Sequence, residues 1–243
     1  MITRLIINCD DFGLTREVSD GIIKAYQEGP ITSTTVMVNE PYAKECLIKL
    51  QETCPEIGLG LHLNITHGSP LTHPATLVDQ HQRFLRPNYY HCHFDEVDEE
   101  EIYQEWLAQL KRFIEITGHL PDHLDSHHNI HLRFSKAYGR LSREYQIPVR
   151  DMNGYVNDFP RLPVYCFDEM TIDLLDHLCH VYEGTLELMT HPGIVTEELK
   201  QISSYAIERQ EELDFWTSDE VKAYLESHHI QCISYQDLIH TDV

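Results

Sequence analysis

The chain has 243 residues, 42% of them hydrophobic, and 40 acidic against 18 basic side chains give it a formal net charge of −22. This length is enough for a sizeable core, and with no internal boundary visible we expect one domain over residues 1–243. The negative charge would repel a phosphate backbone, which argues against nucleic acid as a partner and favours a neutral or cationic ligand. No apolar run approaches the ~18 residues that cross a bilayer, and Asp10 interrupts the N-terminal apolar stretch too early for a signal peptide. We therefore expect a soluble, cytoplasmic protein with no membrane partner.

Apolar segments alternate with helix-like segments along the chain. Strands are expected at residues 4–10, 31–39, 57–65, 121–127, 147–152, 184–191 and 230–235. Helices are expected at 15–29, 42–52, 99–118, 135–146 and 167–180, and one or two more at 204–227, with Thr15 and the Thr217–Glu220 pair as N-terminal caps. Two stretches without a period, 66–98 and 153–164, are expected to be irregular, and a loop as long as the first is usually functional or mobile.

This alternation predicts a mostly parallel sheet covered by helices, in the α/β class. The closed version of such a sheet is a (β/α) barrel, here of about seven strands. Barrels carry their active sites at the C-terminal ends of the strands. Functional residues are therefore expected at those ends.

Carboxylate and imidazole side chains stand at four of these strand ends. Asp10 and Asp11 end the first strand, and His62 ends the third in "GLGLHLN". The fourth strand carries His123, Asp125 and His127 on one face, and His191 follows the sixth in "MTHPG". Neutral imidazole and carboxylate are common ligands of zinc and related divalent ions. A bound cation would also offset the repulsion between Asp10 and Asp11, holding one as a ligand and leaving the other free as a base.

Each of these features, taken alone, has a simpler explanation. An Asp–Asp pair is often a cap or a turn, and a single histidine such as His62 is often a packed, hydrogen-bonded residue. His191 before Pro-Gly can be a turn residue. The conjunction of all four at strand ends of the same kind favours a metal site.

The other histidines and the cysteines do not indicate a second functional site. The run from Tyr90 to His93 could be read as a metal cluster, but it lies in the irregular stretch. The remaining scattered histidines are expected at the surface or in loops: His67, His73, His81, His228, His229 and His240. The seven cysteines are odd in number, and no Cys-x-x-Cys pair occurs. We therefore expect reduced, mostly buried thiols, and neither a disulfide framework nor a cysteine zinc site.

Four segments, "NCDDFGLTREVSDGIIKAYQEGPITSTTVMVN", "GLGLHLNITHGSPL", "HLDSHHNIH" and "HPG", resemble the carbohydrate deacetylase family of the YdjC type, which includes the chitooligosaccharide deacetylases. The resemblance spans nearly the whole chain, with the motifs in the family's order. It implies a distorted (β/α) barrel of the glycoside hydrolase/deacetylase type and a divalent metal ion. It also implies hydrolysis of an N-acetyl group on an acetylated sugar, with release of acetate. A homodimer is what the family suggests.

The resemblance also implies roles for particular residues. The family's metal ligands carry over to Asp11, His62 and His127. By similarity to the wider polysaccharide deacetylases, Asp10 would be the general base and His191 the general acid. Two histidine ligands favour zinc, cobalt or nickel on softness grounds, whereas family descriptions often give magnesium, so Mg²⁺ and Zn²⁺ both stay open.

The chain departs from the family at a few positions. Many members read HHH or HQH where this chain has His127, His128 and Asn129, so the role of the last position is open, as is that of His131. Cys9 stands where Ala is common. Asp125 would either orient an imidazole or serve as a buried structural carboxylate.

Two other functions compete with the deacetylase. A barrel phosphoesterase would often hold two metals and use basic residues on the phosphate, and no Arg or Lys is expected at the key strand ends. A non-catalytic sugar-binding protein would lack a ligand or a base. All five candidate residues are present in this chain, which argues against that alternative.

Overall fold

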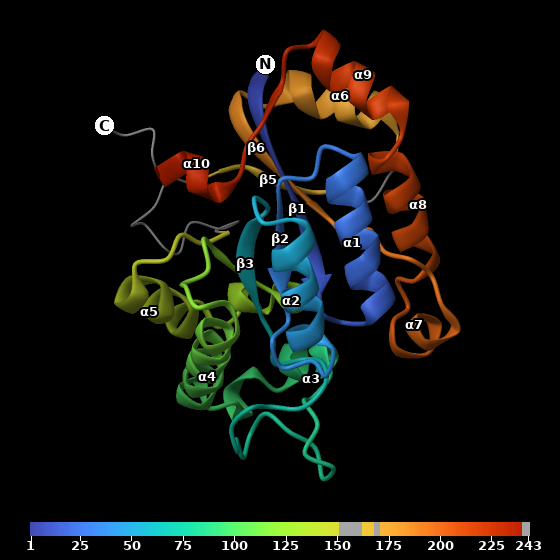
Figure 1. Ribbon diagram of the computed structural model, residues 1–243. Coiled ribbons are helices and arrows are strands. Elements are labelled where there is room, and N and C mark those ends of the chain that lie inside the picture. The colour runs from blue at the N-terminus through green and yellow to red at the C-terminus, as the bar shows by residue number, and fades with distance from the viewer. Residues whose placement is uncertain (151–161, 168–170, 240–243) are drawn as a thin grey trace.

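The computed structural model describes residues 1–150, 162–167 and 171–239, and a curled sheet of seven strands lies at its centre (Figure 1). The strands are β1 (Ile2–Phe12), β2 (Ser33–Val36), β3 (Gly58–Leu63), β4 (Leu124–Ser126), β5 (Val164–Cys166), β6 (Gly184–Thr190) and β7 (Gln231–Cys232). The α-helices are α1 (Arg16–Glu28), α2 (Ala43–Thr53), α3 (Pro87–Cys92), α4 (Glu99–Thr117), α5 (Ser135–Tyr145), α6 (Ile172–Val181), α7 (Glu197–Ile202), α8 (Ile207–Trp216), α9 (Asp219–Ser227) and α10 (Tyr235–Ile239). Two short 3-10 segments are η1 (Phe94–Glu96) and η2 (His127–Leu132).

The paired strands of this sheet run parallel. Their order is β4-β3-β2-β1-β6-β5, and β7 pairs with the beginning of β1. No pairing within the described part of the chain joins β4 to β5, so the curled sheet forms a half-barrel. The predicted distorted (β/α) barrel of about seven parallel strands is thereby confirmed.

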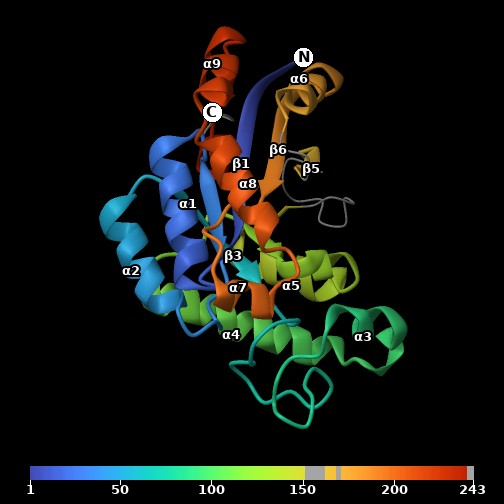
Figure 2. The same cartoon turned by 90° about the vertical axis from the view of Figure 1, so that its right-hand side faces the viewer.

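The helices form a layer on the outside of the curled sheet. α5 packs on α4, α4 on α2, α2 on α1 and α1 on α8, so the layer follows the curl of the strands (Figures 1 and 2). At the start of α1, Thr15 Oγ1 accepts a hydrogen bond from Val18 N at 3.1 Å, while Val18 and Ile22 pack into the core. α4 ends at Gly118, whose φ of 82° suits a residue without a Cβ. Among the described helices, none combines the length and apolar character of a membrane span.

Alternation along β1 separates an apolar outer face from a polar inner face. Leu5, Ile7 and Cys9 join the main hydrophobic core. Asn8 and Asp10 point to the opposite side, inside the half-barrel, and both are buried. The candidate site is thus built on an inward face that the helices do not cover.

The cysteines follow the sequence-based expectation in most cases. All seven are free, and Cys9, Cys46, Cys54 and Cys179 are buried. Cys92 and Cys166 are exposed.

Some elements differ from those predicted. β5 was missed because three residues are too few to show a period. In the strand predicted at 147–152, the described part makes a single bridge from Val149 to Leu124. The cap of α9 is Ser218, which accepts a hydrogen bond from Val221 N, because the neighbouring Thr217 already ends α8.

Two stretches, 66–98 and 153–164, were predicted to be irregular, and the structure describes only the first of them in full. The stretch at 66–98 is irregular apart from the short α3 and η1. Most of the stretch predicted at 153–164 lies outside the described residues. Residues 168–170 of the helix predicted at 167–180 also lie outside the described residues, and this helix is observed from Ile172. His240, one of the scattered histidines, lies outside them as well.

Candidate active site

Asp10 and Asp11 lie where β1 leaves regular strand geometry. The pairing of β1 with β2 shifts between Cys9 and Phe12, and Asp11 has a φ of 67°, in the left-handed region. Adjacent side chains of a regular strand point to opposite faces, whereas this bulge lets both carboxylates line one pocket. Such a backbone in a residue with a side chain is strained by about 1–3 kcal/mol, and strain of this kind clusters at functional sites.

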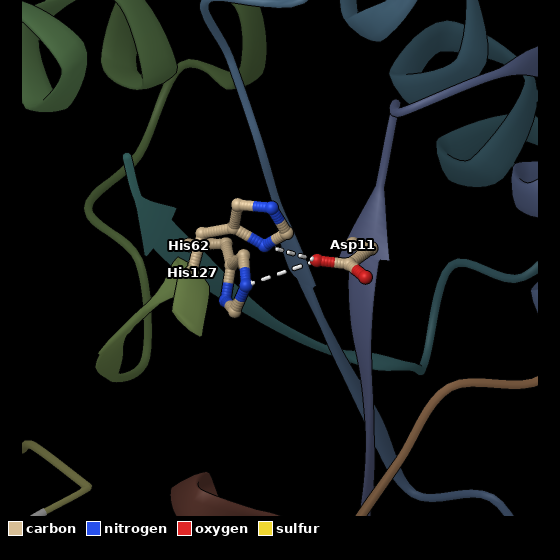
Figure 3. A group of neighbouring side chains, drawn as sticks. All are labelled: Asp11, His62 and His127. Atoms are coloured by element: carbon tan, nitrogen blue, oxygen red, sulfur yellow. Dashed lines mark ion pairs between the residues drawn. The ribbon is translucent and has the colours of Figure 1, made fainter. Parts of the chain in front are cut away.

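The side chains of Asp11, His62 and His127 converge from three different elements, as Figure 3 shows. Asp11 Oδ1 lies 3.2 Å from His62 Nε2 and 2.8 Å from His127 Nδ1. All three residues are buried, and one donor atom of each lies within 4.8 Å of the others. The structure thus brings together the three residues that the family resemblance implied as metal ligands.

The chemistry of this group suits a divalent ion. Asp11 Oδ1 is buried and, within the described chain, has no hydrogen-bond partner of acceptable geometry, although two ring nitrogens face it. Burial alone would raise the pKa of Asp11, but His127 and the Arg209 guanidinium hold it well below its usual range. The carboxylate is therefore ionised, as a metal ligand must be. One carboxylate with two imidazoles is a common donor set for zinc and similar ions.

Asp125 lies behind His62 and fixes its ring. The two residues are direct partners in the β3–β4 pairing, and Asp125 Oδ1 lies 2.6 Å from His62 Nδ1. Thr35 Oγ1 donates to the other oxygen at 2.8 Å. Burial lowers the pKa of His62, but Asp125 and Asp11 outweigh it and raise that pKa to about 10 in the metal-free chain. This geometry favours the orienting role for Asp125, since it turns His62 Nε2 toward Asp11.

Arg150 is a site residue that the sequence analysis missed. Its guanidinium is fully buried and binds Asp10 through Nη1–Oδ2 at 2.7 Å and Nη2–Oδ1 at 2.9 Å. It also contacts Asp125 at 3.0 Å and Glu187 at 2.8 Å. Arg150 comes from outside the four strand ends that the sequence analysis examined, next to Val149, which bridges to Leu124. Arg150 follows the apolar "IPV" segment, a position that could have signalled it.

Asp10 is buried and is held by hydrogen bonds from two side chains, those of Arg150 and Asn8. Besides the two bonds from Arg150, its Oδ1 accepts a hydrogen bond from Asn8 Nδ2 at 2.8 Å. It lies next to Asp11 and lines the same pocket. Each carboxylate oxygen has two lone pairs, so capacity to accept a further proton or hydrogen bond remains.

His191 follows β6 and lies beside a buried carboxylate of α8. Its backbone N–H donates to Glu212 Oε2, and its Nδ1 lies 3.8 Å from Glu212 Oε1, which is too long for a hydrogen bond. Tyr205 donates to Glu212 at 2.6 Å. Burial lowers the pKa of His191, but Glu212, with help from Asp10 and Asp11, raises it overall. The protonated imidazole is thus favoured.

The other residues of the fourth-strand motif have distinct surroundings. His128 and Asn129 line the pocket with φ of 55° and 51°. The His128 ring lies 3.8 Å from that of His127, and burial lowers the pKa of His128 to about 3. His131 is buried, with Nδ1 2.7 Å from Ser126 Oγ and its ring stacked on Tyr138. His131 therefore belongs to the packing around the site.

One pocket of ≈ 690 Å³ contains all five candidate residues, Asp10, Asp11, His62, His127 and His191. Arg209, Arg86 and His67 also line it. Arg209 Nη2 binds Asp11 Oδ2 at 2.5 Å. Arg86 and His67 come from the long segment between β3 and α4, at the end of the molecule toward which the strands point (Figure 2). His67 was expected at the surface or in a loop, and it lies in the loop after β3 with its side chain 15% exposed.

The run from Tyr90 to His93 does not form a metal cluster. Tyr90 is buried, with its hydroxyl donating to Ile65 O at 2.7 Å, while His91, Cys92 and His93 are exposed. Within the described residues, the candidate metal groups draw only on Asp10, Asp11, His62, Asp125 and His127.

Two curated proteins are similar to this chain over nearly its whole length. A curated relative from Listeria innocua, named carbohydrate deacetylase 2, is 36% identical over 97% of this chain and 98% of its own length. A relative from Vibrio vulnificus, named carbohydrate deacetylase, is 36% identical over 97% of this chain and 96% of its own length.

Solved structures share the fold. A crystal structure from Enterococcus faecalis, described as a cellobiose-phosphate cleavage protein, has a TM-score of 0.88 and 32% identity, covering 98% of this chain and 99% of that one. A Streptococcus mutans CE4 esterase has a TM-score of 0.53 at 12% identity, covering 96% of this chain and 85% of that one, and shares the fold alone.

Residues 4–227 match the profile of the YdjC-like proteins. The chain therefore belongs to the YdjC-like protein family, as its motifs predicted.

Proposed function

We propose that the chain is a metal-dependent hydrolase that removes an N-acetyl group from an acetylated sugar, such as a chitooligosaccharide, and releases acetate. The observation that carries this proposal is the convergence of Asp11, His62 and His127 beside Asp10 and His191 in one pocket. The names of the curated relatives support sugar deacetylation.

Asp11, His62 and His127 would hold the ion. When bound there, a divalent ion supplies Lewis-acid polarisation of the acetyl carbonyl and makes water easier to deprotonate. The two imidazole donors support zinc over magnesium, because magnesium prefers oxygen ligands.

Asp10 takes the proton of the attacking water. Its carboxylate is positioned by Arg150 and Asn8, so it need not reorganise during the reaction. The water oxygen bonds to the carbonyl carbon as the proton passes to Asp10.

His191 donates a proton to the sugar nitrogen as the C–N bond breaks, which leaves acetate and an amino sugar. Glu212 supports this role because its charge favours the protonated imidazole. General acid–base groups typically contribute ~10²–10⁴-fold to a rate.

A phosphoesterase finds less support. Two arginines lie against the proposed base and metal ligands, but Arg150 is bound to carboxylates and Arg209 is bound to Asp11. Neither is free to bind a phosphate.

One observation favours a phosphorylated form of the acetylated sugar as a second candidate substrate. Arg86 lines the pocket, and within the described part of the chain no carboxylate forms an ion pair with it. The similar protein from Enterococcus faecalis is described as a cellobiose-phosphate cleavage protein. A higher kcat/KM for the phosphorylated sugar, lost in Arg86→Met, would support this candidate, and equal values would reject it.

The test of the proposed function is acetate release from N,N'-diacetylchitobiose by the metal-loaded protein. We expect release that stops after EDTA treatment and falls at least ~10²-fold in Asp10→Asn. Release that survives EDTA, or that is unchanged in Asp10→Asn, would contradict the mechanism.

A further inference from the structure

A second histidine–carboxylate pair lies beside the candidate metal residues. His67 follows β3 and Glu40 follows β2, and His67 Nδ1 lies 2.8 Å from Glu40 Oε1. The side chain of Glu40 is 4% exposed and that of His67 is 15% exposed. The carboxylate is thus buried behind the ring, while part of the ring stays accessible.

The backbone of His67 is fixed from both ends by amide side chains. Asn64 Oδ1 accepts from His67 N at 3.0 Å, and Asn64 Nδ2 donates to His67 O at 2.8 Å. Asn39 Nδ2 donates to the same carbonyl at 3.2 Å. The position of this histidine is therefore set before any ligand arrives.

Gly68 shows how closely the pair is packed. Its φ is +72°, and a Cβ built on it would lie 2.5 Å from Glu40 Oε1. A side chain here would collide with the oxygen that holds His67. The absence of a Cβ at position 68 is thus part of how the pair is built.

The accessible part of His67 faces the proposed reaction centre. His67 lines the same pocket as Asp11, His62 and His127, and its ring centre lies 6.2 Å from that of His127. Nδ1 is engaged by Glu40, and across the described residues no hydrogen bond is made to Nε2. His67 does not belong to either candidate metal group. Its free nitrogen is therefore placed for a ligand in the pocket.

We propose that His67, oriented by Glu40, is a substrate-binding residue that hydrogen-bonds a hydroxyl group of the sugar through Nε2. This inference rests on the proposed function. A sugar hydroxyl can donate to or accept from an imidazole nitrogen, so either ring protonation state can make the bond. Because the bond lies on the sugar and away from the reacting amide, it stabilises the ground state and the transition state equally. Losing such uniform binding raises KM and leaves kcat unchanged.

The test compares His67→Asn and Glu40→Gln with the wild type, in acetate release from N,N'-diacetylchitobiose and in bound metal per chain. His67→Asn is expected to raise KM about 3- to 10-fold, the range for one lost hydrogen bond, with kcat and metal content unchanged. Glu40→Gln is expected to raise KM by less, because it loosens the ring without removing it. The matched control is His73→Asn, an exposed histidine of the same segment, which is expected to leave KM unchanged.

Two results would overturn the inference. One is an unchanged KM in His67→Asn. The other is a loss of bound metal or of kcat in that variant, which would assign His67 to the metal site or to the chemistry.

Calorimetric binding of chitobiose, the fully deacetylated disaccharide, separates this inference from the proposed function. Sugar binding that is weaker in His67→Asn, in a protein that releases no acetate, would reject the deacetylase and support the inference. Acetate release by wild type together with equal chitobiose binding in both proteins would retain the deacetylase and reject the inference.

Discussion

Arg150 binds both carboxylate oxygens of Asp10, through Nη1–Oδ2 at 2.7 Å and Nη2–Oδ1 at 2.9 Å, in the interior of the half-barrel. The same guanidinium contacts Asp125 and Glu187. One buried cation therefore links the proposed base to the carboxylate that orients His62. Arg150 therefore both stabilises the buried carboxylates and positions the proposed base, Asp10.

The first prediction concerns stability. Arg150→Met leaves Asp10, Asp125 and Glu187 buried without their common cation, and removing one partner of a buried ion pair costs about 3–5 kcal/mol. The free energy of unfolding from urea titration is expected to fall by that amount. Arg112→Met, at an exposed Arg112–Glu115 pair, is the matched control and is expected to stay within about 0.5 kcal/mol of wild type. Similar losses in the two variants would contradict the structural role of Arg150.

The second prediction concerns metal affinity. Asp125→Asn removes the charge that orients His62, and substitutions of such supporting residues typically weaken metal binding about 10- to 100-fold. Zinc titration by calorimetry measures the change. Asp173→Asn, at an exposed position, is expected to bind zinc like wild type. A zinc affinity equal to that of wild type in Asp125→Asn would mean that Asp125 is a buried structural carboxylate with no effect on the metal site.

The third prediction concerns pH. Burial lowers the pKa of His191, whereas Glu212 with Asp10 and Asp11 raises it. Glu212→Gln removes one raising charge, so the pKa of His191 falls. A general acid acts when protonated, so the alkaline limb of kcat/KM is expected to move to lower pH in this variant.

The control for the pH profile is Glu211→Gln, at the exposed neighbouring position of α8. Both proteins would carry the same ion, so the difference between their profiles isolates Glu212. An alkaline limb that stays in place in Glu212→Gln, or moves to higher pH, would exclude His191 as the acid that Glu212 tunes.

The fourth prediction compares two glycines. Gly68 and Gly118 both have left-handed φ, of +72° and +82°, and alanine at either position costs about 1–2 kcal/mol for the backbone alone. A Cβ at Gly118 meets no atom within 4 Å, whereas at Gly68 it lies 2.5 Å from Glu40 Oε1. Gly68→Ala is therefore expected to lose more unfolding free energy than Gly118→Ala, and to raise KM as His67→Asn does. Equal losses and an unchanged KM would show that Glu40 moves aside freely.

The strand-end rule located most of the candidate site from sequence. His62 and Asp125 share the inward face of adjacent parallel strands, and the period of two placed both correctly. The same rule could not show why Asp10 and Asp11 reach one pocket, because that depends on the bulge and on the left-handed backbone of Asp11.

The roles of residues whose partners lie far away in the chain could not be predicted from the sequence. Arg150 is explained only by Asp10, Asp125 and Glu187, which come from three different strands. His67 lies in a segment without a period, so its direction could not be predicted. Its partner Glu40 follows another strand, and only the fold brings the two together.

The proposed mechanism requires that Asp11, His62 and His127 together hold one divalent ion. The most direct measurement is anomalous diffraction from crystals of the full chain grown with zinc, recorded at the zinc absorption edge. We expect one strong peak within bonding distance of Asp11 Oδ1, His62 Nε2 and His127 Nδ1, and no peak there in Asp11→Asn crystals. A peak at other residues, or no peak in the wild-type pocket, would contradict it.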